Sequence, residues 1–358
     1  MPSLKEIKGR INSISSTLAI TSAMKMVAAA KLQKAQMAIQ NMLPYERRLH
    51  SMLIDLMGAM NISAAASEDG SVRGSGSAER GFDQSGDRLS LSNRHDLAGM
   101  DGAYSLMAQR EVRKVAIVAF ASNSSLCGAF NSNVIREATA VINEYRASGL
   151  GDADITVYSV GRKMAEAMKK LGFPSPADFT KMSDSPSYEA ASALAQELLD
   201  GFVSGRFDKV ELVYNHYKST SSQPTTRQTY LPLSLADATA DLQAGKIADS
   251  ASESDTNRGA EPVGAPVVRQ GSPTTEDLIV EPSKEALIAT LLPKVIRLRI
   301  FTTLLDSAAA EHAARTVAMQ LATDNGNDLL QELTLEYNKG RQQKITSEIL
   351  DLVGGSMQ

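Results

Sequence analysis

The N-terminal region repeats its apolar residues in alternating steps of four and three, and this period constrains the fold more than any other feature of the sequence. Nine of the eleven positions are apolar, with Thr21 and Lys25 as the exceptions. The positions are Ile7, Ile11, Ile14, Leu18, Thr21, Lys25, Ala28, Leu32, Ala35, Ile39 and Met42. A 3.5-residue period held this long keeps one seam facing a partner only if two helices wind left-handedly around each other. Residues 1–61 are therefore predicted to form one helix of a coiled coil, with a kink at Pro44, which lacks a backbone donor.

The partner helix is expected at the C-terminal end, in residues 278–358. This region is rich in the strong helix formers alanine, leucine, glutamate and glutamine. At about 1.5 Å per residue, a helix from Pro293 to Val353 would be roughly 90 Å long. Its apolar register shifts at Asp324, Asn325 and Gly326. Small residues at both ends of the chain would let two helix axes approach closely, although they are also simply good helix formers. They are Ala28, Ala29, Ala30, Ala308, Ala309, Ala310, Ala313 and Ala314.

Charge is unevenly distributed along the chain. Residues 1–48 carry eight Lys/Arg and two acids, Glu6 and Glu46, whereas the whole chain has a net charge of −4. The overall acidic balance argues against a nucleic-acid-binding protein. The basic N-terminal helix either has a solvated face or binds an acidic protein partner.

The middle of the chain alternates between strand and helix periods over residues 111–235. Buried strands are predicted at Val115–Ala121, Ile155–Val160 and Lys209–Tyr217, with an edge strand at Thr225–Leu233. The intervening helices are predicted at Asn133–Tyr145, Arg162–Leu171 and Tyr188–Val203. This alternation is typical of a mostly parallel, Rossmann-like sheet. The fold class is thus α/β plus a long two-helix coiled coil formed by the two ends of the chain.

Two polar segments flank this central domain. Residues 62–106 and 236–276 are rich in Ser, Gly, Asp and Ala and have almost no apolar periodicity. Such segments bury too little apolar surface to offset the entropy of ordering. We therefore expect flexible insertions at 62–110 and 236–277.

The sequence carries no recognisable catalytic or cofactor-binding motif. The first strand is followed by SNSSLCGAFN, in which Gly128 is the single glycine, where a dinucleotide-binding fold would place G-x-G-x-x-G. Cys127 is either a packed small residue or a nucleophile without a histidine near it in sequence. The four histidines, His50, His95, His216 and His312, have no second metal ligand at a convincing spacing. We predict a non-catalytic protein without cofactor or metal.

No stretch approaches the roughly 20 apolar residues that span a bilayer, and MPSLKEIKGRI lacks the apolar core of a secretory signal. A single cysteine fits a reducing compartment. These features predict a soluble chain facing the cytoplasm. The early basic residues Lys5, Lys8 and Arg10 could alternatively belong to an organellar presequence, but the helical pattern that they open continues far beyond one.

Several ordered segments resemble the gamma subunit of F-type ATP synthases. At the N-terminus the similar segment is IKGRINSISSTLAITSAMKMVAAAKLQKAQ, and in the middle LCGAFN, GRK and VYNHYKSTSSQ. Towards the C-terminus they are EPS, EHAARTVAM, ATDN, LEYNKGRQQKIT and ITSEILDLVGGS. The chain departs from the family pattern at Ala19 and Ser22, at Asn123–Ser125 in place of Asp-Arg-Gly, and at Gly355–Ser356 in place of Gly-Ala.

The resemblance implies a rotating central stalk. In that family the terminal helices form an antiparallel left-handed coiled coil inside a hexamer of alternating alpha and beta subunits. The α/β domain forms the base of this rod and contacts epsilon and the c-ring. Proton flow through the ring drives ATP synthesis, and hydrolysis drives the stalk in reverse. The chain would then lie on the cytoplasmic side of a bacterial inner membrane, peripheral to it and not inserted.

The resemblance also assigns contact residues. Arg341 and Gln342 match a pair that hydrogen-bonds a loop of the beta subunit, and Thr346 and Glu348 match polar positions in the same contact. Met24 matches a position at the lower rotor–stator contact. Two rival functions remain: an α/β oxidoreductase, which would bind NAD, and a free-standing coiled-coil scaffold, which would not associate with ATPase subunits.

Overall fold

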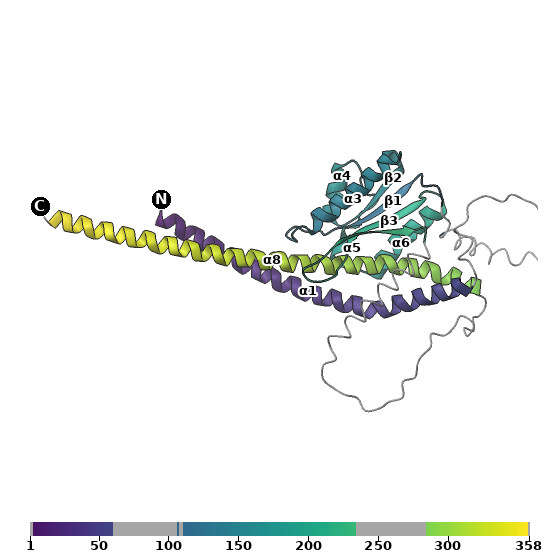
Figure 1. Ribbon diagram of the computed structural model, residues 1–358, viewed down its shortest axis with the longest axis horizontal. Helices are drawn as coiled ribbons and strands as arrows, with labels where there is room; N and C mark the ends of the chain where they lie inside the picture. The colour runs from purple at the N-terminus through teal and green to yellow at the C-terminus, as the bar shows by residue number, and fades with distance from the viewer. Residues whose placement is uncertain (1–2, 60–105, 107–109, 234–283, 357–358) are drawn as a thin grey trace, which may run out of the picture.

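The computed structural model describes residues 3–59, 106, 110–233 and 284–356. Two long helices, α1 (Leu4–Ala59) and α8 (Lys284–Ser356), lie along each other, and an α/β body packs on the flank of α8 (Figure 1). We call the two helices the shaft and the α/β body, residues 110–233, the base. The segments predicted as flexible at 62–110 and 236–277 lie outside the described residues, except for Leu106 and Arg110, and so do His95 and the EPS motif.

The shaft helices run antiparallel. A Cβ added to Gly340 would meet Leu4, and one added to Gly326 would meet Leu18. One turn further along α1, the Thr323 hydroxyl donates to Thr21 Oγ1 over 3.1 Å. All eleven positions of the 3.5-residue period are buried or half-buried, whereas most residues between them are exposed. The sequence period therefore marks the face of α1 that packs against α8.

Both prolines of the shaft lie inside a continuous helix. α1 continues through Pro44, and α8 begins nine residues before Pro293 and continues through it. With 73 residues, α8 is about 110 Å long. The predicted register shift at Asp324–Gly326 does not interrupt the helix, and Gly326 leaves room there for the Leu18 side chain. The kink at Pro44 stays a prediction.

The base contains a four-stranded sheet in the order β2-β1-β3-β4. β1 (Val115–Phe120) pairs in parallel with β2 (Ile155–Val160) and with β3 (Lys209–Asn215), and β4 (Thr225–Leu231) pairs antiparallel with β3. The predicted strands and the predicted edge position of the fourth are confirmed. The apolar run of β1 is buried on both faces, as expected for a central parallel strand.

Helices cover both faces of the sheet. Val115, Ile117 and Ala119 of β1 face α3 (Phe130–Ala147) and α4 (Arg162–Lys170) in one apolar cluster. The alternate residues Ala116, Val118 and Phe120 share a second cluster with α6 (Tyr188–Val203) and with α8. The three predicted helices are confirmed within a few residues. Sequence analysis missed two short elements, a 3-10 turn at Asp152–Asp154 and α5 (Thr180–Asp184), which are too short to show a period.

Gly161 allows the close packing between β1 and the start of α4. Its φ is +98°, and a Cβ at this position would lie 2.0 Å from the carbonyl oxygen of Ala121. The backbone of Lys163 also donates to Ser122 O over 3.1 Å, so neither segment can move away freely. The GRK motif thus requires glycine for backbone conformation and for space.

We expect Gly161→Ala to destabilise the chain by about 3 kcal/mol, because it combines a left-handed backbone with a backbone clash. Gly172→Ala is the matched control, since Gly172 has φ +91° but no atom within 4 Å of an added Cβ. That control should cost only about 1 kcal/mol. Urea denaturation of the two purified chains measures the difference, and equal losses would contradict the role of the clash.

A buried carboxylate ties the sheet to α3. Glu211 on β3 is 1% exposed, and it accepts a hydrogen bond from Tyr145 Oη over 2.6 Å and from Arg227 Nε over 2.7 Å. Lys209 Nζ lies 2.6 Å from the same carboxylate, and Arg227 also pairs with Glu144 of α3. Burial alone would raise the pKa of Glu211, but the bonds from Arg227, Lys209 and Tyr145 outweigh it and hold the pKa below its usual value.

We expect Glu211→Gln to destabilise the chain by about 2–3 kcal/mol at neutral pH, because it leaves two cations without their buried partner. Because the pKa of Glu211 is lower in the folded chain than in the unfolded chain, its ionised form stabilises the fold above the unfolded pKa. This stabilisation is lost as the pH falls through the folded-state pKa. The difference between the two chains should therefore shrink below about pH 4, as followed by urea denaturation at several pH values. A pH-independent difference would contradict this assignment.

Candidate functional site

The end of α8 projects as a bare helix with exposed apolar side chains. Leu4 lies opposite Gly340, so residues 341–356 extend past the described part of α1 (Figure 1). Leu352 is 75% exposed and Leu350 is 65% exposed in this end. Ile345, Ile349 and Val353 are exposed as well. We call residues 341–356 the tip. Large apolar side chains gathered on one projecting helix are typical of a surface that a partner covers.

Four of the five predicted contact residues lie on the tip and are exposed. Arg341 and Glu348 are seven residues apart, and Gln342 and Thr346 are four apart, so each pair lies on one side of the helix. The Thr346 hydroxyl donates to the carbonyl of Gln342 over 2.9 Å, and Glu348 lies 3.7 Å from Lys344 Nζ. Such exposed pairs stabilise a helix little, which leaves these groups available to a partner.

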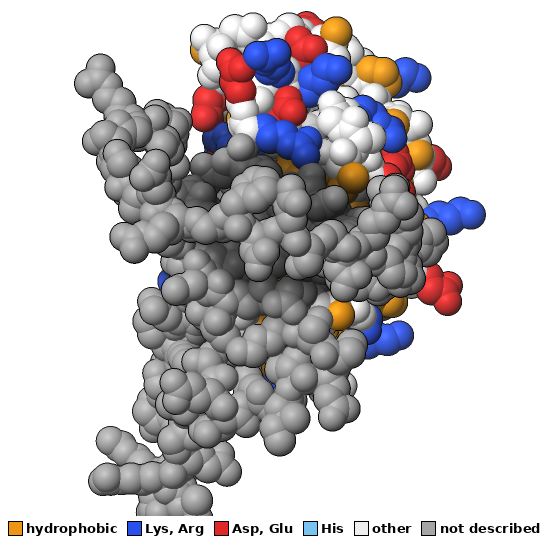
Figure 2. All heavy atoms as spheres, turned by 90° about the vertical axis from the view of Figure 1, so that its right-hand side faces the viewer, with side chains coloured by type: hydrophobic (Ala, Val, Ile, Leu, Met, Phe, Trp, Pro, Cys, Tyr) orange, Lys and Arg blue, Asp and Glu red, His pale blue; other side chains and the backbone are white. Residues whose placement is uncertain are grey.

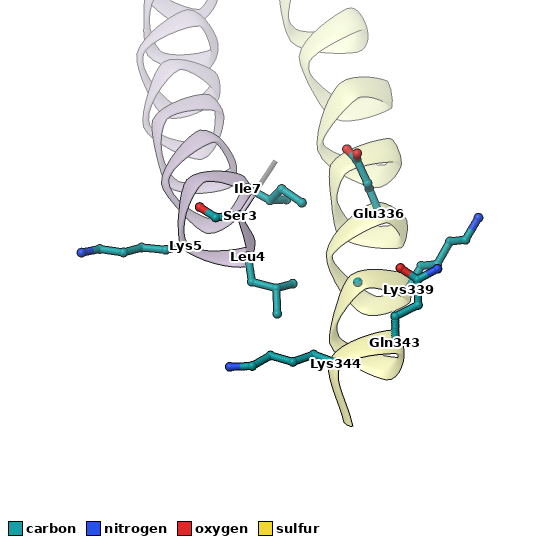
Figure 3. A pocket seen from close by; sticks show the side chains of 9 residues that line it. Ser3, Leu4, Lys5, Ile7, Glu336, Lys339, Gln343 and Lys344 are labelled. Carbon is teal, nitrogen blue, oxygen red and sulfur yellow. The ribbon is translucent and has the colours of Figure 1, made fainter. Parts of the chain in front are cut away.

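A groove of about 610 Å³ opens where α1 begins beside α8 (Figure 3). Leu4 and Ile7 point toward α8, and Lys5 points away from the groove. Lys339, Lys344 and Glu336 line the α8 side. The groove is continuous with the tip, so the candidate surface includes the first turn of α1.

The fifth predicted residue, Met24, lies elsewhere. It lines a cavity of about 320 Å³ where α1, α8, α5 and the loop after β1 meet. Because the seam residue Thr21 packs opposite Thr323, Met24 lies roughly 30 Å along the shaft from Arg341. The structure therefore does not bring Met24 together with the tip residues; the two form separate candidate contacts.

The cavity at Met24 contains a buried ion pair that sequence analysis missed. Arg315 Nη2 donates to Glu311 Oε1 over 2.6 Å and to Ser124 Oγ over 2.8 Å, and Nη1 donates to Ser125 O over 2.7 Å. Burial raises the pKa of Glu311, although the hydrogen bond and the charge of Arg315 act to lower it. The EHAARTVAM motif contains this pair at i, i+4 spacing, which was the available signal.

His312 lines the same cavity. Burial lowers its pKa to about 4, and the charges of Lys31 and Arg315 act in the same direction. Its Nδ1 is buried and has no hydrogen-bond partner among the described residues. His312 is therefore neutral at physiological pH.

The shaft occupies the place where open α/β sheets bind ligands. With β1 between β2 and β3, the chain reverses its winding at the carboxyl ends of β1 and β3, which is where such sheets hold a nucleotide. Here Ala310 of α8 packs on Cys127 and Phe130 after β1, and Asp306 of α8 binds His216 and Tyr217 after β3. The crevice is filled by a helix of the same chain.

The other candidate residues have packing or pairing roles. Cys127 is 1% exposed and contacts apolar side chains, as the packed-residue interpretation predicts. His216 pairs with an aspartate, and His50 is buried on α1. Within the described ranges, no group of three or more His, Cys, Asp or Glu is placed to hold a metal ion. In the same ranges, no helix combines the length and apolar character needed to cross a membrane.

We expect Arg315→Ala to destabilise the chain by about 3 kcal/mol, because it leaves Glu311 buried without its partner. Arg10→Ala is the matched control: Arg10 and Glu6 form the same i, i+4 pair at 2.9 Å, but both are exposed. Its loss should cost about 0.5 kcal/mol or less. Urea denaturation compares the two, and a control loss as large as that of Arg315→Ala would contradict the importance of burial.

Comparison with known proteins gives a consistent result along the whole chain. A family model described as ATP synthase matches residues 3–357. The ATP synthase gamma chain of Phocaeicola vulgatus is 47% identical over 357 residues, covering 100% of both chains. That of Bacteroides thetaiotaomicron is 45% identical over 358 residues, again covering 100% of both.

Among solved structures, a chain of the Euglena gracilis mitochondrial ATP synthase assembly of OSCP, F1 and c-ring is similar with a TM-score of 0.52. It is 18% identical, and the match covers 99% of this chain and 93% of that chain. At this identity the likeness shows a shared fold.

Proposed function

The chain belongs to the ATP synthase gamma-chain family and is a central-stalk, non-catalytic subunit of an F-type ATP synthase; we propose that its shaft turns inside a hexamer of alpha and beta subunits. The observation that carries the proposal is the antiparallel pairing of α1 and α8 into a slim rod whose tip exposes apolar side chains. In this proposal α1 and α8 wind as a left-handed coiled coil, as the 3.5-residue period of α1 predicts.

The shaft couples rotation to chemistry by touching three equivalent catalytic sites unequally. Beyond Gly340 only α8 continues among the described residues, so the end of the rod is asymmetric about its axis. A ligand or partner shifts a conformational equilibrium only by its differential affinity for the two states. An asymmetric tip therefore biases each surrounding subunit toward a different nucleotide affinity, and rotation moves that bias from one subunit to the next.

Individual side chains take defined roles in this proposal. Arg341 and Gln342 hydrogen-bond a loop of the beta subunit, with Thr346 and Glu348 in the same contact, and Met24 lies at a lower contact with the hexamer. The excess of Lys/Arg in residues 1–48 gives α1 an affinity for acidic loops of the beta subunits. The apolar residues of the tip supply the area buried in the contact.

The base forms the lower contacts, with epsilon and with the c-ring. On the part of the base visible in Figure 2, Lys and Arg side chains alternate with Asp and Glu. This mixture favours protein partners over nucleic acid. Proton flow through the c-ring would turn the base and the shaft together. The chain is then peripheral to the membrane, on the cytoplasmic side of a bacterial inner membrane. The proposed domain bounds are 1–61 and 278–358 for the two coiled-coil segments and 111–235 for the central α/β domain.

We expect Gln342→Ala to lower ATP synthesis by the assembled complex about fivefold, because it removes a hydrogen bond to the hexamer that is made in only part of the rotational cycle. Arg341→Ala should lower ATP synthesis by a similar factor for the same reason. Gln331→Ala is the matched control, since Gln331 is an exposed glutamine of α8 three turns nearer the base and on the same side of the helix.

The measurement is respiration-driven ATP synthesis in inverted membrane vesicles, normalised to the amount of complex. Gln331→Ala should stay within about twofold of the wild type, the usual range for an exposed surface change. Wild-type rates from an assembled Gln342→Ala complex would remove this residue from the mechanism. Failure of the chain to copurify with alpha and beta subunits would favour the free-standing scaffold, and saturable NAD binding would favour the oxidoreductase.

A further inference from the structure

One aspartate of α8 holds the carboxyl end of β3. Asp306 Oδ2 lies 2.6 Å from His216 Nδ1, and the backbone N–H of Tyr217 donates to Asp306 Oδ1 over 2.9 Å. Gln36 Nε2 of α1 donates to Tyr217 Oη over 2.6 Å. Two adjacent residues of the base thus bind both helices of the shaft at one level.

This joint is one of several polar contacts between base and shaft; the others include the bonds of Arg315, the bond from Tyr230 Oη to Ile296 O and the bond from Arg297 Nη2 to Gln196 Oε1. α6 packs on α8 through apolar side chains such as Leu198, Phe202 and Ile296, and apolar contacts are non-directional. Hydrogen bonds weaken steeply when their angle changes. A torque between base and shaft would therefore meet its directional resistance at these polar contacts, the bonds to Asp306 among them.

We propose that Asp306 is a positioning residue of the rotor, which fastens the base to the shaft by a grip that weakens when His216 loses its proton. The inference rests on the proposed function, because it concerns how torque passes from base to shaft. Asp306 touches no nucleotide and acts through the orientation of α8.

The surroundings of His216 set how the grip depends on pH. The hydrogen bond to Asp306 raises the pKa of His216, against burial and the charge of Lys218 on the same loop. Glu46 of α1, Arg299 of α8 and Tyr214 of β3 line the same cavity of about 240 Å³. The closest opposite charge, Asp306, lies at hydrogen-bond distance and decides the direction.

The sign of the dependence follows from the raised pKa. The charged pair is complete below the ordinary histidine pKa of 6.5 and is lost as pH rises through the folded-state value above it. Below the transition Asp306 binds a cation and a backbone N–H; above it a neutral imidazole can still donate to the carboxylate, but the Coulomb attraction between the two charges is lost. The attachment of α8 to the end of β3 through Asp306 should therefore weaken above neutral pH.

The test uses the assembled complex in inverted membrane vesicles and measures protons pumped per ATP hydrolysed between pH 6.5 and pH 8.5. His216→Asn keeps a donor near the position of Nδ1 but cannot be protonated, and Asp306→Asn keeps an acceptor for the Tyr217 N–H. At pH 6.5 both variants should pump about two- to threefold less per ATP than the wild type, and the gap should close by pH 8.5.

Tyr217→Phe is the matched control, because it removes the bond to Gln36 from the same joint without changing a group that titrates in this range. It should lower pumping by a similar factor at every pH. If the histidine and aspartate variants behave like this control, or like the wild type at all pH values, the proposal is overturned. Copurification of each variant with alpha and beta subunits is checked in parallel; a wild-type chain that fails this check overturns the proposed function itself.

Discussion

The structure depends on how closely α8 can approach two neighbours at once. Within Ala308–Ala314 the helix packs Ala309 and Ala313 against Leu32 of α1 and, from another side, Ala310 against Cys127 and Phe130 of the base. Ala309, Ala310 and Ala313 are fully buried. A longer side chain at any of them would separate the helix axes or lift α8 from the sheet. Polar bonds from Asp306 and Arg315 flank this run on either side.

This arrangement explains why a doubly wound sheet here carries no nucleotide chemistry of its own. The sheet order places its crevice at the ends of β1 and β3, and in other proteins a glycine-rich loop would hold a phosphate there. In this chain the loop after β1 offers Ser124 and Ser125 to the guanidinium of Arg315. The same backbone geometry that could bind a ligand binds a helix instead, so the fold alone does not identify the function.

Much of the fold could be predicted from sequence because its strongest patterns are local. The period of α1, the apolar runs of β1 and β2 and the long alanine-rich C-terminal stretch each extend over enough residues to be recognised. α5 could not be predicted, since five residues do not complete two turns. The candidate site was harder to predict from the sequence. Arg341, Gln342, Thr346, Glu348 and Met24 came from a resemblance, and whether they touch a partner is a property of an assembly. The bonds from Arg315 to Ser124 and Ser125 and the joint at Asp306 connect residues far apart in the chain, so no short window of sequence contains them.

The two glycines of α8 that face α1 have a mechanical consequence. The Leu18 side chain fills the space left by Gly326, and the Leu4 side chain fills the space left by Gly340 on the opposite helix. Sliding one helix along the other by a single turn would press each leucine against a side chain instead of a bare backbone. Axial slippage of one helix along the other is therefore opposed at two levels of the shaft.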